Sequence, residues 1–124
     1  MKLLAIYFSV ILMMTACNNS DLPIKNKALT ISKNGEHLYQ CGNNVQVKAT
    51  YYALSDDSLS FVKLALPNEP EITLAQAISA SGERYSNESL EWWVTGLEAF
   101  AQTRNQDQEW QFMYQNCHAI EKAS

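Results

Sequence analysis

The residues with the most chemical potential in this sequence are three cysteines and two histidines. Cys41 and Cys117 lie 76 positions apart, and they form no zinc-ligand motif with His37 or His118. The sequence also contains no glycine-rich phosphate loop and no Gly-x-Ser-x-Gly nucleophile motif. Its carboxylates do not stand in the apolar settings that tune a general acid. We therefore predict no metal site, no cofactor and no enzymatic activity.

Residues 1–16 have the pattern of an export signal. Lys2 gives a positive start, and the apolar run after it is shorter than the ~20 residues of a membrane-spanning helix. The sequence Met-Thr-Ala-Cys that ends at Cys17 resembles a bacterial lipoprotein box, which implies cleavage before Cys17 and lipid attachment to it. Several acyl chains would anchor the protein durably. Asn18 favours the outer membrane, so we expect a lipid-anchored protein that faces the periplasm; an ordinary secretory signal, with this cysteine there by chance, is the alternative.

If Cys17 carries the lipid, Cys41 and Cys117 can pair with each other in one way. An exported protein meets an oxidising compartment, so a disulfide is the expected state. The bridge would close nearly the whole domain into one loop, which on the chain-entropy model contributes ~4–4.5 kcal/mol. A domain of roughly 80 residues is marginal on core burial alone, so this contribution matters.

The charge of the chain is acidic. It has 9 basic and 13 acidic side chains and a net charge of −4, which becomes about −5 once Lys2 is removed with the signal. An acidic chain is a poor partner for nucleic acid, whose binding depends on neutralising phosphates. The same charge steers a basic protein toward the chain, so we expect a basic protein partner.

The rest of the chain divides into a polar tether, one domain and a short tail. Residues 17–36 are rich in polar side chains and predict a tether, with room for a short strand at residues 28–31. Short apolar runs separated by turn residues follow and predict a small antiparallel sandwich or barrel over residues 37–119. Residues 120–124 form the tail. The expected strands are 38–41, 45–51, 59–66, a run with Ile72, Leu74 and Ile78 on one face, and 110–115.

The segment from Leu90 to Ala101 fits two structures. Its apolar residues fall on helical spacing, but Gly96 in the middle would cost a helix about 1 kcal/mol. The pair Trp92-Trp93 favours a strand instead. In a strand these two side chains point to opposite sides, so one would be core and the other a partly exposed rim residue. The pattern alone leaves both structures open.

Five motifs occur in an order that resembles a known family. They are Tyr-Gln-Cys at 39–41, Ala-Thr-Tyr-Tyr at 49–52, Ser-Ala-Ser-Gly-Glu-Arg-Tyr at 79–85, Trp-Trp-Val-Thr-Gly-Leu-Glu-Ala at 92–99, and a late Cys117. This order is similar to that of the membrane-bound inhibitors of c-type lysozyme, over about residues 38–117. The resemblance implies an all-β fold, a small eight-stranded antiparallel barrel closed by one disulfide. It also implies that residues 90–102 are strand and not helix.

The resemblance also implies a binding site. In the family, a serine of the Ser-Gly loop and a lysine after the tryptophans enter the lysozyme cleft and meet its catalytic carboxylates. These positions correspond to Ser81, whose hydroxyl can donate one hydrogen bond, and to Thr95, which donates a hydroxyl bond but brings no charge. The neighbouring residues Gly82, Arg84 and Tyr85 complete the predicted lysozyme-binding set.

We therefore expect an envelope lipoprotein that inhibits c-type lysozyme by inserting loops into its active-site cleft. The threonine at position 95, together with the negative charge of Glu83 in the loop, motivates an alternative. In that alternative the barrel has lost c-type activity and binds another lysozyme type, a hydrophobic ligand or an envelope component. An interior filled by side chains would count against the hydrophobic ligand, since small eight-stranded barrels have little spare room.

Overall fold

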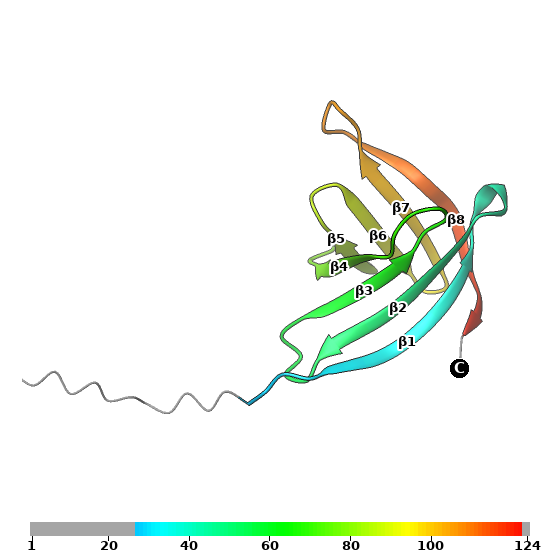
Figure 1. Ribbon diagram of the computed structural model, residues 1–124. Coiled ribbons are helices and arrows are strands. Elements are labelled where there is room, and N and C mark those ends of the chain that lie inside the picture. Colours follow the sequence, from blue (N-terminus) through cyan, green and yellow to red (C-terminus); the bar gives the residue numbers. More distant parts are fainter. Residues whose placement is uncertain (1–26, 123–124) are drawn as a thin grey trace, which may run out of the picture.

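The chain folds into a closed, eight-stranded antiparallel barrel in the computed structural model, which describes residues 27–122. Each strand pairs with the next along the chain, and β8 returns to pair with β1, so the sheet has no free edge (Figure 1). The expected signal segment, the lipidated Cys17 and the tether up to residue 26 lie outside the described residues. The strands are β1 (Ile31–Gln40), β2 (Gln46–Leu54), β3 (Ser60–Ala65), β4 (Ile72–Ala77), β5 (Glu83–Ser86), β6 (Leu90–Thr95), β7 (Glu98–Arg104) and β8 (Trp110–Lys122).

The predicted fold class is confirmed, but several strand limits differ from the prediction. β1 begins at Ile31, within the range expected to be tether, and β8 continues to Lys122, past the expected end of the domain at residue 119. The added residues of β1 pair with β2, whereas the extension of β8 helps to close the barrel, which pairs His37 with Lys122 and Gln40 with His118. Ile78 was expected to lie on the same strand face as Ile72 and Leu74. The strand ends at Ala77 instead, and Ile78 is 96% exposed in the loop that follows.

The barrel interior is filled by the inward-facing residues of nearly every strand. Trp92 of β6 lies at the centre with none of its surface exposed, and its ring meets that of Tyr39 edge to face at a centroid distance of 5.0 Å. This filled interior counts against a hydrophobic ligand inside the barrel. The other fully buried side chains of large volume are Leu64, Leu74, Val47, Val62 and Cys117.

The ambiguous segment forms two strands, β6 and β7, joined by a tight hairpin. Trp92 faces the core while Trp93 is half-buried on the outer wall, which confirms the predicted division of the pair. Gly96 has φ of +61° and begins the two-residue turn between Thr95 and Glu98. Positive φ at the first turn position suits glycine and matches the twist of a hairpin. The resemblance had implied strand throughout this segment, and the turn at Gly96 divides it.

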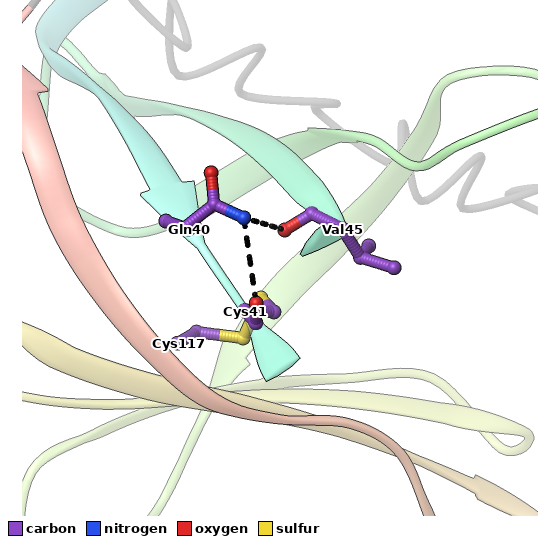
Figure 2. Close-up of a disulfide and its surroundings, with 4 residues drawn as sticks. All are labelled: Gln40, Cys41, Val45 and Cys117. Carbon is purple, nitrogen blue, oxygen red and sulfur yellow. Dashed lines mark hydrogen bonds between the residues drawn. A yellow bond between two sulfur atoms is a disulfide. The ribbon is translucent and has the colours of Figure 1, made fainter. Parts of the chain in front are cut away.

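The predicted disulfide joins Cys41, just after β1, to Cys117 in β8 (Figure 2). Both cysteines are buried. The side chain of Gln40 donates to the carbonyl oxygens of Cys41 and Val45, each at 3.5 Å, and so ties the turn after β1 to the start of β2. The bridge therefore holds the first strand of the barrel to the last. The only helix in residues 27–122 is a single turn, η1 (Gly42–Asn44), and none there is long and apolar enough to cross a membrane.

Candidate functional site

The loop between β4 and β5 is held in place through its backbone. Trp93 donates its indole N–H to the carbonyl oxygen of Ser81 at 3.0 Å. The hydroxyl of Ser79 donates to the carbonyl oxygen of Gly82 at 2.8 Å. Both bonds use main-chain oxygens, so they fix the path of the loop without using the hydroxyl of Ser81, which is an exposed residue. The loop thus presents a hydroxyl group from a preset backbone.

Gly82 allows this loop to lie directly against the end of β6. Its φ is +67°, a conformation that side-chain-bearing residues adopt at a cost. A Cβ atom there would collide with the carbonyl oxygen of Val94 and would lie 2.8 Å from Oγ1 of Thr95. The loop and Thr95 are therefore neighbours. Two segments that are separate in the sequence place Ser81, Gly82 and Thr95 at one end of the barrel.

Arg84 lies on the outer wall and is engaged by its neighbours. It pairs across the strands with Trp93, and its guanidinium carbon lies 5.9 Å from the centroid of that ring. Its Nε lies 3.2 Å from Oε1 of the buried Glu91. This nitrogen is itself buried, and it makes no hydrogen bond within the part of the chain that the structure describes. Glu91 also accepts a hydrogen bond of 2.6 Å from Gln102. Arg84 is thus part of a side-chain cluster behind the loop, with 30% of its side chain exposed.

Tyr85 points into the barrel and is only 4% exposed, so its phenol has little surface to offer a partner. Its hydroxyl donates to Oε2 of Glu83 at 3.0 Å, and its ring lies 5.5 Å from that of Tyr51. Burial, with the negative charge of Glu83 added, raises the pKa of Tyr85 well above its usual range. Tyr85 therefore lies beneath the surface, where its neutral hydroxyl donates the hydrogen bond that holds the Glu83 carboxylate at the mouth of the barrel.

A cavity of about 380 Å³ opens at this mouth, beside the Gly82 turn. At its base the hydroxyl groups of Tyr39 and Tyr51 are 3.0 Å apart, and Trp92 donates its indole N–H to Tyr51 at 3.1 Å. Burial raises the pKa of both phenols, so they remain neutral at physiological pH. The mouth is thus lined by aromatic rings, neutral hydroxyls and the imidazole of His37, with Glu83 as its carboxylate.

The sequence prediction missed the part that Trp93 plays in this site. It identified a rim tryptophan but not the bond from its indole to the Ser81 carbonyl. Across the β6–β7 hairpin, Thr95 pairs with Glu98, a second exposed carboxylate that sequence reasoning did not single out. Within residues 27–122, no group of three or more histidine, cysteine, aspartate or glutamate side chains is placed to hold a metal ion. The arrangement can donate hydroxyl hydrogen bonds from a preformed surface that is acidic.

Comparison with known proteins agrees with this geometry. A family described as "membrane-bound lysozyme-inhibitor of c-type lysozyme" matches residues 39–110, more than half of the chain. The matched range contains the Ser81 loop, the Trp92-Trp93 pair and Thr95. A search of curated proteins gives no significant match. The chain therefore belongs to the family of membrane-bound inhibitors of c-type lysozyme.

Proposed function

We propose that this protein is an envelope lipoprotein that inhibits c-type lysozyme by placing the Ser81 loop and the end of β6 in the active-site cleft of the enzyme. Family membership implies lysozyme inhibition. The proposed mode of inhibition rests on one observation. Gly82 packs against Thr95, so two short segments form a single preformed surface. A surface that needs no rearrangement on binding avoids an entropic cost.

The chemistry of this surface is hydrogen bonding without a positive charge. The hydroxyls of Ser81 and Thr95 each have one proton to donate to a carboxylate in the cleft. A lysine at position 95 would add charge-assisted bonds, which are roughly twice as strong as neutral ones. Its absence lowers the affinity by an amount on the order of 2–3 kcal/mol, or ~30–150-fold. We therefore expect a weaker inhibitor than one that has lysine here.

Two carboxylates flank the surface, and their negative charge has two opposing effects on binding. Glu83 lies at the barrel mouth and Glu98 at the β6–β7 hairpin. Their charge speeds the approach of a basic enzyme through long-range steering. At close range Glu83, which belongs to the inserted loop, repels carboxylates in the cleft, because like charges at an interface are unfavourable. The complex should therefore form faster at low salt, and its affinity should depend strongly on ionic strength.

The proposal includes attachment to the outer membrane through lipid on Cys17, on the periplasmic side. The lipoprotein-box resemblance of residues 14–17 supports it, and so does the family's description as membrane-bound. Metabolic labelling with a palmitate analogue tests it directly. Label on the wild-type chain that Cys17→Ala abolishes is the expected result, and an unlabelled wild-type chain would contradict the anchor.

The inhibition itself is tested by measuring the lysis of bacterial cell walls by c-type lysozyme while the mature chain is titrated in. We expect lysis to slow as the chain is added and the inhibition to weaken with salt. If micromolar concentrations of the folded chain leave the rate unchanged, the proposed function is wrong for c-type lysozyme. The same titration against other lysozyme classes then tests the alternative target.

A further inference from the structure

The outer wall formed by β6, β7 and β8 carries a row of three aromatic side chains, Trp93, Phe100 and Phe112. The rings of Trp93 and Phe100 are stacked at a centroid distance of 6.0 Å. Phe112 meets Phe100 edge to face at 5.4 Å and is 60% exposed. The three strands lie side by side in Figure 1. Trp93 and Phe100 are half-buried, so the row forms one partly exposed apolar patch, and such patches mark interaction surfaces more often than single exposed residues do.

A hollow of about 440 Å³ lies along this aromatic row, and irregularities in β8 account for it. Between the pairs Ala99–Cys117 and Ala101–Tyr114, β8 has one residue more than β7. Asn116 in this stretch has φ of +55°, so the strand bulges opposite Phe100. Bulges bend a strand and redirect its side chains. The hollow is thus built into the strands, and Thr95, Glu98, Gln115 and His118 are among the residues that line it.

We propose that this aromatic row is the second half of the lysozyme-binding surface, so that the enzyme that receives Ser81 and Thr95 also covers Trp93, Phe100 and Phe112. The inference rests on the proposed function and specifies which wall of the barrel the enzyme covers. The partner it requires is a basic protein with apolar side chains beside its cleft.

The size of the loop surface is the first argument. A stable protein–protein interface buries about 800 Å² on each partner. Two small loop residues and one threonine supply only a small part of that area, so an enzyme seated on the loop must also cover an adjoining wall. A few side chains contribute most of the affinity at such interfaces, and tryptophan is among the residue types enriched there.

Continuity with the loop is the second argument. Trp93 belongs to both surfaces, because its N–H holds the carbonyl of Ser81 while its ring stacks on Phe100. Thr95 lines the hollow as well. An enzyme seated over the loop and Thr95 therefore reaches the aromatic row without crossing other surface.

Charge is the third argument. Glu98 lines the hollow and is largely exposed. Its nearest basic neighbour in the described part of the chain is Nδ1 of His118 at 3.7 Å, which is charged only when protonated. An ammonium or guanidinium group of a basic enzyme can pair with this carboxylate.

Another aromatic pair, Tyr52 and Phe61, lies across the barrel on β2 and β3. Its rings are stacked at 5.2 Å, and both residues are half-buried. In the closed order β2 lies four strands from β6 and β3 lies four strands from β7, so this pair is on a different wall from the aromatic row. It offers a matched control of similar chemistry on a wall that the proposal leaves uncovered.

The test compares Phe112→Ser with Phe61→Ser in the mature chain, by inhibition of c-type lysozyme and by thermal unfolding. We expect Phe112→Ser to weaken inhibition about tenfold, the effect of losing one aromatic contact at an interface centre, and Phe61→Ser to change it less than twofold. If the wild-type chain does not inhibit lysozyme, the proposed function fails. If it inhibits and the two variants behave alike, this inference is overturned while the proposed function stands.

A second variant makes the test independent of the folding of Phe112→Ser. Glu98→Gln removes a charge from an exposed side chain and leaves its shape almost unchanged. We expect weaker inhibition with a shallower salt dependence, because one attractive charge pair is lost. An unchanged salt dependence would place Glu98 and the hollow outside the interface.

Discussion

Replacing Thr95 with lysine restores the charge that this chain lacks at the end of β6. The position is exposed and lies beside Gly82, so a longer side chain can extend into solvent without disturbing the core. Facing the carboxylates of the cleft, the ammonium gains about 2–3 kcal/mol from charge-assisted bonds. We therefore expect Thr95→Lys to be the stronger inhibitor.

The structure also identifies what reduces this gain. Glu98 lies opposite position 95 in the hairpin, so the new ammonium can pair with it in the free protein. An exposed pair of this kind is worth about 0.2–1 kcal/mol and must break on binding. The net gain is then about 1–3 kcal/mol, which is roughly 5–150-fold in affinity.

The assay is the inhibition constant from cell-wall lysis, measured for wild type, Thr95→Lys and a matched control, Thr73→Lys. Thr73 is exposed near the start of β4, so the control changes the same residue type and the same charge away from the loop. It should leave inhibition within about twofold of wild type, as expected for a rim charge. If Thr95→Lys inhibits no better than wild type, the reasoning is refuted, because residue 95 then does not face the carboxylates of the cleft.

Three further predictions concern stability. Gly82→Ala should lower the free energy of unfolding in urea by at least about 1–2 kcal/mol and weaken inhibition, because φ is positive and a Cβ would strike the neighbouring strand; Gly35→Ala, where a Cβ meets nothing within 4 Å, is the control and should retain full inhibition. Replacing Cys41 and Cys117 together with serine should cost up to about 4.5 kcal/mol in thermal or urea unfolding, and a loss below about 1 kcal/mol would contradict the role given to the bridge. The pKa of the Tyr51 phenol is raised, so above pH 10 the unfolded chain loses a proton that the folded chain keeps. The free energy of unfolding should therefore be flat up to about pH 9 and fall above pH 10. Tyr51→Phe should reduce that fall, and an alkaline profile identical to that of the wild type would count against the burial of this proton.

Much of the fold could be predicted because it depends on local patterns. The alternation of apolar and polar residues along β2 gives one inward and one outward face, and the structure buries Val47 and Ala49 as that period requires. The same rule divides Trp92 from Trp93. The pairing of Cys41 with Cys117 was predictable because two cysteines remain once Cys17 is assigned to lipid.

The predictions that failed concern where a pattern stops. Ile78 continues the apolar period of β4, but β4 ends at Ala77 and the side chain is exposed. A strand ends where no neighbouring strand remains to share backbone hydrogen bonds. The alternation of apolar residues within one segment does not tell how far the neighbouring strand extends. For the same reason the tether was expected to reach residue 36, although β2 extends far enough to pair with residues 31–36.

The sequence by itself therefore determined the fold class, the bridge and the two short motifs of the site. Tertiary structure decided how those motifs combine. It brought the carbonyl oxygen of Ser81 to the indole N–H of Trp93, placed Gly82 against Thr95 and turned Tyr85 inward. The first two contacts join residues that are 12 and 13 positions apart, and the third depends on the curvature of the closed sheet. A local period specifies neither. The sequence shows that residue 95 has no positive charge, whereas it is the folded hairpin that places the carboxylate of Glu98 opposite this residue.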